Sequence, residues 1–144
     1  MSVERGEPPV ASDGAGRAAP PGATDGAGRA DRLAARIARD GAACVWCGRA
    51  FGRLVRATTD HLVPRVRGGP SWLENEVAAC GRCNRARGHR GAADWADECE
   101  RVGWPVDRAR LVRTLRELDE AIDRRGGQRR ARAQIAAQLR RLDA

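Results

Sequence analysis

Apolar residues recur at helical spacing along the last third of the chain. From Asp107 onward, leucine and isoleucine occupy positions 111, 115, 118 and 122, three or four residues apart. After Gly126-Gly127 the same spacing continues through Ile135, Leu139 and Leu142. The pattern predicts two amphipathic helices joined at the glycines, which form a helical hairpin packed on the rest of the protein.

Two shorter stretches also have a helical pattern. In residues 31–40, Leu33 and Ile37 share one face, Asp31 is a candidate cap and Gly41 ends the run. In residues 92–102, Trp95, Cys99 and Val102 lie on one side. Because Cys99 has no partner at metal-ligand spacing, we interpret it as a small buried apolar residue.

The centre of the chain has a pattern typical of a β-hairpin. Residues 51–59 are predicted to form one strand, and the apolar residues 77–79 are short enough to be the return strand. Between them, residues 64–71 contain two prolines and a Gly-Gly pair, which excludes regular structure. Residues 72–76 are predicted to make one helical turn, and residues 84–88 to open a short helix after the second strand.

This order of elements predicts an α+β fold with three parts. Residues 1–29 are rich in Gly, Ala and Pro and are interpreted as a disordered tail. Residues 30–92 form the central module with its preceding helix, and residues 93–144 form a C-terminal helical region. A chain of 144 residues fits this plan of one small domain with tails.

Composition limits the core that this module can build. Apolar residues make up 42% of the chain, but many are alanine and only 3% of residues are aromatic. A large core is therefore excluded, and another interaction should stabilise the fold. We expect this stabilisation within the central module.

The positive charge is concentrated in the centre of the chain. The formal net charge is +8, and residues 44–92 contribute +6 from nine arginines and three acidic residues. This distribution is typical of a polyanion-binding surface. The alternative is a solvated basic face with no partner.

Cysteine usage indicates the compartment. Five cysteines without a signal peptide favour thiolate chemistry over disulfides. No segment approaches the roughly 20 apolar residues of a membrane span. We therefore expect a cytoplasmic protein with no membrane partner.

Four of the cysteines form two Cys-x-x-Cys pairs, Cys44 with Cys47 and Cys80 with Cys83, separated by 32 residues. Each pair places two sulfurs on one tight turn, and four thiolates complete the closed tetrahedral site that Zn²⁺ prefers. Such a site stabilises folding directly. An iron–sulfur centre or two redox pairs are the alternatives.

Catalytic chemistry must lie outside a closed metal site. Asp60 and His61 end the first predicted strand, and Asn84 follows the last paired cysteine. The second cysteine pair would fold the helix start back toward the strand end, so the three side chains can converge. Carboxylate and amide oxygens suit Mg²⁺, and a neutral imidazole can take a proton from water near neutral pH.

The order of these motifs resembles the four-cysteine subgroup of the HNH endonuclease family. The resemblance covers residues 44–90: Asp-His-x-x-Pro, a Gly-Gly loop, Trp-x-Glu-Asn and Cys-x-x-Cys-Asn. It implies a zinc-stabilised ββα-metal fold, with His61 as general base, and Asp60 and Asn84 as ligands of a catalytic Mg²⁺ or Mn²⁺. It also implies that the catalytic-motif residue Asn75 braces the loop that orients His61.

The resemblance therefore predicts a metal-dependent endonuclease that hydrolyses phosphodiester bonds in DNA. One departure is Arg87, where the family usually has lysine. The expected phosphate contacts are Arg65, Arg67, Arg82, Arg85 and Arg87. The alternative is a non-catalytic zinc-ribbon nucleic-acid-binding protein, and the sequence leaves open whether the protein is a monomer or a homodimer.

Overall fold

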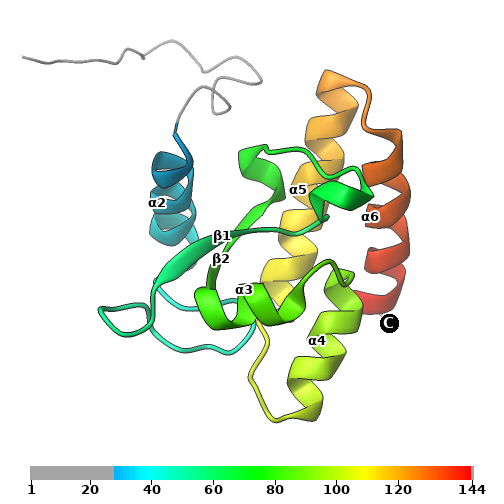
Figure 1. The fold of residues 1–144 in the computed structure, drawn as a ribbon. Helices are drawn as coiled ribbons and strands as arrows, with labels where there is room; N and C mark the ends of the chain where they lie inside the picture. The colour runs from blue at the N-terminus through cyan, green and yellow to red at the C-terminus, as the bar shows by residue number, and fades with distance from the viewer. Residues whose placement is uncertain (1–27, 144) are drawn as a thin grey trace, which may run out of the picture.

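The computed structural model describes residues 28–143, which form helices around one two-stranded sheet (Figure 1). The helices and strands, in chain order, are α2 (Arg29–Asp40), β1 (Ala57–His61), β2 (Glu76–Cys80), α3 (Gly81–Arg87), α4 (Ala92–Arg101), α5 (Arg108–Arg125) and α6 (Arg129–Leu142). This confirms the α+β class. Of the predicted tail, residues 1–27 lie outside the described residues, and Arg29 already begins α2. Within residues 28–143, no helix is long and apolar enough to cross a membrane.

The sheet is an antiparallel hairpin in which Ala57 lies opposite Cys80 and His61 lies opposite Glu76. The prediction that the first strand begins at residue 51 is wrong, because β1 begins six residues later. Before it, Leu54 is 92% exposed. Its partner β2 has only five residues, so the preceding segment has no strand to pair with.

The connection between the strands is more ordered than predicted. It contains two short 3₁₀ turns, η1 (Arg65–Arg67) and η2 (Leu73–Asn75). The second is the helical turn expected near Trp72, but the first lies where regular structure was excluded. Gly68 ends η1 at a φ of 95°, in the left-handed region where a side chain would be strained. Helix α3 begins at Gly81 instead of Asn84, so Cys83 lies in its first turn.

The predicted C-terminal helical hairpin is present as α5 and α6, which run side by side next to the sheet (Figure 1). Its apolar stripe continues the core of the central module, and one cluster of buried side chains includes Trp46, Val77, Leu115 and Ile135. Cys99 is buried in this cluster, as predicted. Helix α4 is fastened to α6 by the Gln138 side chain, whose Oε1 accepts a bond from the Ala93 N–H.

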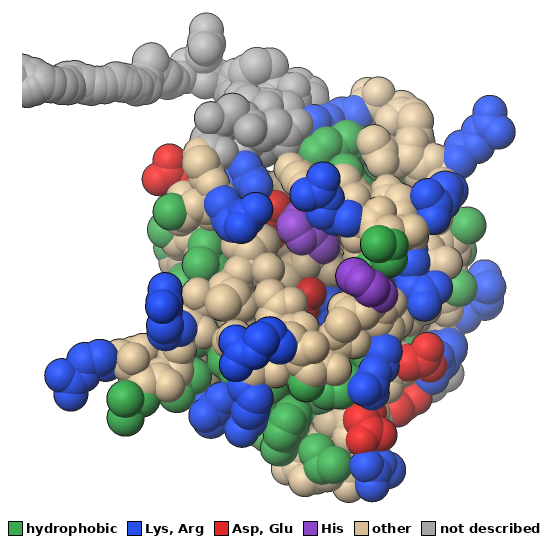
Figure 2. Space-filling view, viewed as in Figure 1, with side chains coloured by type: hydrophobic (Ala, Val, Ile, Leu, Met, Phe, Trp, Pro, Cys, Tyr) green, Lys and Arg blue, Asp and Glu red, His purple; other side chains and the backbone are tan. Residues whose placement is uncertain are grey.

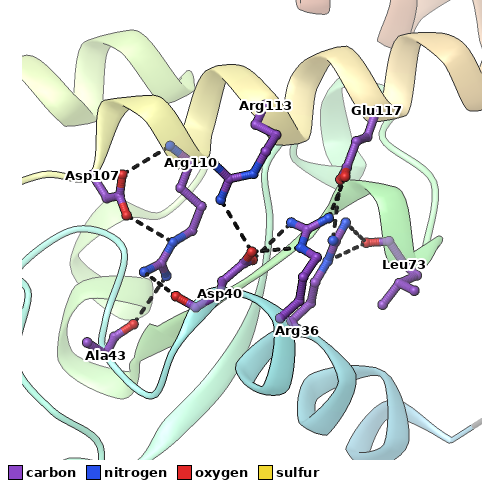
Figure 3. A network of polar contacts seen from close by, with 9 residues as sticks. Arg36, Asp40, Ala43, Leu73, Asp107, Arg110, Arg113 and Glu117 are labelled. Atoms are coloured by element: carbon purple, nitrogen blue, oxygen red, sulfur yellow. Dashed lines mark hydrogen bonds and ion pairs between the residues drawn. The ribbon is translucent and has the colours of Figure 1, made fainter.

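Buried arginines join α2 to η2 and to α5 (Figure 3). Arg36 donates to the carbonyl oxygen of Leu73 at 3.0 Å. From α5, Arg110 donates to the carbonyl oxygens of Ala43 and Asp40 at 3.2 and 3.3 Å. Because Asp40 also lies 3.4 Å from Arg113, the end of α2 is held by two arginines of α5. These contacts fix α2 against the module that follows it.

Candidate active site

The four paired cysteines come together at the end of the hairpin where β1 starts and β2 finishes. All four side chains are buried, and their sulfur atoms lie within 4.8 Å of one another. The Sγ atoms of Cys47 and Cys80 are 3.9 Å apart. Tetrahedral Zn–S bonds of about 2.3 Å place sulfurs about 3.8 Å apart, so the donor set and its spacing fit a zinc ion.

Neighbouring donors favour the thiolate form of Cys80, whereas burial raises the pKa of Cys44 and of Cys83. Arg49 donates to Cys80 Sγ at 3.3 Å, and the Trp46 N–H donates to Cys44 Sγ at 3.4 Å. Burial opposes ionisation of Cys80, but hydrogen bonds from the Cys83 backbone and from Arg49 outweigh it and lower the pKa of Cys80 to about 6. A thiolate is the form that a metal requires.

The predicted base His61 and the two predicted cation ligands line one small pocket beside the hairpin, whereas Asn75 lies outside it. Asp60 and His61 come from the end of β1, and Asn84 comes from α3 across the hairpin. The pocket has a volume of about 190 Å³ and its remaining walls are Thr59, Pro64, Arg65, Gly88 and His89. The structure thus brings together three residues that the sequence separates by up to 24 positions.

Two polar atoms of this pocket are suited to a hydrated cation. The Asn84 amide nitrogen donates to Thr58 Oγ1 at 3.0 Å and to the Thr59 carbonyl at 2.9 Å. This fixes the amide and leaves its oxygen as the atom for a ligand. The Thr59 hydroxyl is buried and has no hydrogen-bond partner among the described residues. Buried polar atoms normally have a partner, so a bound ion or its water would complete this site.

Asp60 is held by two buried donors. Trp46 Nε1 donates to its Oδ2 and Arg87 Nη1 to its Oδ1, each at 2.8 Å. Burial raises the pKa of Asp60, and the ion pair with Arg87 and the indole N–H oppose that rise. Each carboxylate oxygen keeps a second lone pair for a cation. Through Trp46, the carboxylate is also connected to the first cysteine pair.

The predicted phosphate contact by Arg87 is wrong. The side chain is 1% exposed and pairs with Asp60. Its other nitrogens donate to the carbonyl oxygens of Leu62 at 2.7 Å and Arg90 at 3.0 Å. Because these contacts use the guanidinium inside the protein, Arg87 fastens α3 to the end of β1 and presents no charge to solvent.

His61 lies between the pocket and a buried carboxylate. Its Nε2 is 3.3 Å from Ser71 Oγ and 3.6 Å from Glu76 Oε2. Glu76 is 1% exposed, and Arg32 of α2 donates to its other oxygen at 2.9 Å. Burial lowers the pKa of His61 below its ordinary value, although the charges of Glu76 and Asp60 oppose this. The imidazole is therefore neutral at pH 7 and able to accept a proton.

The Asn75 side chain is completely buried and holds the loop between the strands from within. Its oxygen accepts a bond from the Val63 N–H at 2.8 Å, and its nitrogen donates to the carbonyls of Val63 and Pro70. A Cβ at Gly69 would lie 1.8 Å from the Val63 oxygen, so only glycine fits this closed loop. Asn75 thus braces the loop that follows His61.

The remaining predicted phosphate contacts lie in two places. Arg65 and Arg67 are exposed on η1 beside the pocket, whereas Arg82 and Arg85 are exposed on α3, outside its walls. Arg82 also lies over the Trp104 ring at 4.4 Å. Arginine side chains surround the histidines on the face shown in Figure 2.

Sequence reasoning missed Glu76, Trp46 and Thr59 as parts of the site. The one available signal was a charged residue at the start of an otherwise apolar strand, which marks Glu76 as a buried group needing partners. Trp46 and Thr59 carried no such signal, because indole and hydroxyl groups are common in ordinary cores and strands. Their roles depend on which atoms the fold brings near them.

Comparison with known proteins gives matches to nucleases over the same region. Residues 44–90 match the family model "HNH endonuclease". The chain is similar to the CRISPR-associated endonuclease Cas9 of Corynebacterium diphtheriae, with 34% identity over 74 residues, and to that of Actinomyces naeslundii, with 38% identity over 60 residues. These alignments cover 51% and 41% of this chain but only 7% and 5% of the two relatives.

A solved structure is also similar, the crystal structure of the Type II-C Cas9 enzyme from Actinomyces naeslundii. The alignment covers 76% of this chain and 11% of that chain, with 28% sequence identity and a TM-score of 0.47. The chain therefore spans a small fraction of the length of the proteins it matches. The family match and the two sequence alignments agree with the cysteine cluster and the pocket geometry. The part of the chain that matches the HNH endonuclease family model, residues 44–90, contains both the cysteine cluster and the residues that line the pocket.

Proposed function

We propose that this protein is an endonuclease that hydrolyses phosphodiester bonds in DNA with a divalent cation, Mg²⁺ or Mn²⁺. The observation that carries the proposal is the pocket shared by Asp60, His61 and Asn84 within a region that matches the HNH endonuclease family. A structural Zn²⁺ in the four-cysteine cluster would join the segment before β1 to the end of β2.

His61 is the general base in this proposal. A neutral imidazole beside the phosphate takes a proton from the attacking water as the new P–O bond forms. Asp60 and Asn84 provide oxygen ligands for the cation, and Arg87 and Trp46 hold the Asp60 carboxylate in place. When bound, the cation supplies electrostatic stabilisation of the phosphate and of the departing oxygen.

The test is plasmid nicking by the full chain with Mg²⁺ or Mn²⁺, compared with His61→Ala and Asn84→Ala. We expect His61→Ala to lose about 10² to 10⁴ in rate while it keeps zinc, fold and DNA binding. For Asn84→Ala, we expect a weakened response to the divalent cation and partial recovery of the rate at high Mn²⁺ concentration.

Two results would count against the proposal. If His61→Ala nicks DNA at the parental rate, His61 is not the base. If the parent protein binds DNA but never nicks it with either cation, the zinc-ribbon binding protein is the better account. Zinc content and circular dichroism of each variant separate both results from misfolding.

A further inference from the structure

The pocket with Asp60, His61 and Asn84 continues into a second hollow on the same surface. This hollow has a volume of about 450 Å³ and is formed by η1 and α6, with walls that include Arg67, His89, Arg130 and Gln134. His89 also lines the pocket with His61, so the two cavities adjoin at this side chain. We refer to these two adjoining cavities as the groove, and its α6 wall lies beyond residues 44–90.

Close contacts fix α6 against this groove. Arg130 donates to the carbonyl oxygen of Val66 at 2.7 Å, and a Cβ at Gly68 would lie 2.7 Å from the Arg130 Cβ. From the other side, Arg67 donates to the His89 carbonyl at 2.9 Å. The guanidinium groups of Arg67 and Arg130 are therefore positioned by backbone oxygens, each of which uses only part of the donor capacity of an arginine.

The arginines of the groove differ from most of those on the far side of the C-terminal hairpin. Among the described residues, no carboxylate forms an ion pair with Arg65, Arg67 or Arg130. Several exposed arginines elsewhere on the C-terminal hairpin have a carboxylate partner: Arg116 with Asp143 at 2.7 Å, Arg141 with Asp97 at 2.7 Å and Arg132 with Asp123. Others, such as Arg124 and Arg140, form no ion pair among the described residues. Arg65, Arg67 and Arg130 thus bring three positive charges without a carboxylate partner to the walls of the two cavities.

The stability of α6 does not explain arginine at its start. The first turn of α6 contains no acidic residue, and positive charge at a helix N-terminus is unfavourable for the helix itself. No acidic side chain lines the larger cavity. A polyanion in the groove would offset this repulsion.

We propose that α6 completes a DNA-binding groove, in which Arg67 and Arg130 bind the backbone phosphates next to the phosphate at His61. This rests on the proposed function, which places a scissile phosphate in the pocket. Successive phosphates advance about 3.4 Å along each strand, so the neighbours of that phosphate must lie over the adjoining surface. The C-terminal helix then contributes to substrate binding as well as to the core.

The test uses binding and not cleavage, so it does not depend on the chemistry. Affinity for a fluorescent DNA duplex is measured by anisotropy with the full chain carrying His61→Ala, in Mg²⁺ and at several salt concentrations. Ala133→Glu adds a negative charge to the groove, because Ala133 is exposed on α6 and lines the larger cavity. Ala109→Glu is the matched control: it makes the same change at an exposed helical alanine that lines neither cavity.

We expect Ala133→Glu to weaken binding by about fivefold or more and Ala109→Glu to leave it within about twofold. Arg130→Ala and Arg67→Ala should each weaken binding, with little dependence on DNA sequence. Each should also reduce the slope of log affinity against log salt concentration by the amount expected for about one phosphate contact. Arg132→Ala is the control for removal of an arginine from α6, since its partner lies on α5.

The inference is overturned if Ala133→Glu and Arg130→Ala both bind DNA as the parent does while zinc content and circular dichroism are unchanged. It is also overturned if these variants lose affinity for single-stranded RNA and not for DNA. Failure of the proposed function would look different: the groove variants would change binding, but the protein with His61 intact would not nick DNA.

Discussion

The Asp60 side chain connects the pocket to the four-cysteine cluster. Asp60 faces the proposed cation site, yet its oxygens also accept bonds from Trp46 of the first cysteine pair and from the buried Arg87. Replacing Asp60 by alanine would therefore affect folding as well as catalysis, because Arg87 would remain buried without its partner. Asn84 is uncharged, so its replacement removes hydrogen bonds to Thr58 and Thr59 but leaves no buried charge unpaired, and its variants report on the cation more directly.

Arg87→Met tests whether Arg87 is structural. We expect this variant to lose about 3 to 5 kcal/mol of unfolding free energy, because it leaves the Asp60 carboxylate buried without its ion pair. Urea denaturation followed by circular dichroism measures this loss. Arg85→Ala removes an exposed arginine from the same helix and should stay within about 0.5 kcal/mol. Equal stability of the two variants would contradict the structural role of Arg87.

The acid limb of the cleavage rate should report His61. Burial lowers the pKa of His61 below its ordinary 6.5, so more than half of the base is neutral at pH 6.5 and the midpoint of the acid limb lies at lower pH. Glu76 opposes this shift, so Glu76→Gln should move the midpoint to a still lower pH. Initial nicking rates between about pH 5 and 8 at a saturating cation concentration measure both midpoints. A parental midpoint above 6.5 would show that the protonated form is favoured.

At the scale of secondary-structure elements, the hairpin is too short to be stable alone. Each strand has five residues, and an isolated two-stranded hairpin is at best marginally stable in water. The cysteine cluster closes one end of the hairpin, and the Asn75 brace closes the loop at the other end. The pocket lies beside the hairpin between these two supports, so its geometry depends on both.

Loss of the metal site should therefore unfold the hairpin. We expect Cys44→Ser to release zinc and to lose the cooperative thermal transition, because binding of the metal supplies folding free energy. Cys99→Ala is the control, since Cys99 is equally buried but lies outside the four-cysteine cluster. Elemental analysis and thermal denaturation of both variants decide the matter. A Cys44→Ser protein with parental stability in the absence of zinc would contradict the structural role of the cluster.

Across the whole molecule, α2 and the C-terminal helices pack around the region of residues 44–90 that matches the HNH family model. Arg32 of α2 holds Glu76 behind His61, and α6 packs against η1 beside the pocket. The apolar core runs without a break from the first cysteine pair to α6. We therefore expect residues 28–143 to unfold together, with the flanking helices contributing to the stability of the site.

DNA affinity should depend on this folded part and hardly on residues 1–27. That segment has two arginines and four acidic residues, so it adds no favourable charge for DNA. Deleting it should change the slope of log affinity against log salt concentration by less than the amount expected for one phosphate contact. Anisotropy titrations of both proteins between about 50 and 200 mM salt measure the slopes. Abolished binding after the deletion would place the DNA surface elsewhere.

The sequence by itself determined the features that depend on residue type and spacing. Two Cys-x-x-Cys pairs indicate a four-sulfur cluster because few other arrangements suit four thiols. The 3.6-residue period predicted α5 and α6, since an apolar stripe must be buried. The order of Asp60, His61 and Asn84 around these motifs identified the pocket residues that the structure brings together.

Only the tertiary structure decided which arginines are exposed. Arg87 and Arg67 look alike in the sequence, but one is buried against Asp60 and the other lies exposed at the groove. In the same way, Glu76 became part of the site because strand register places it opposite His61. Contacts between distant segments determine burial, strand register and the approach of α6 to η1. Local sequence patterns do not predict such contacts.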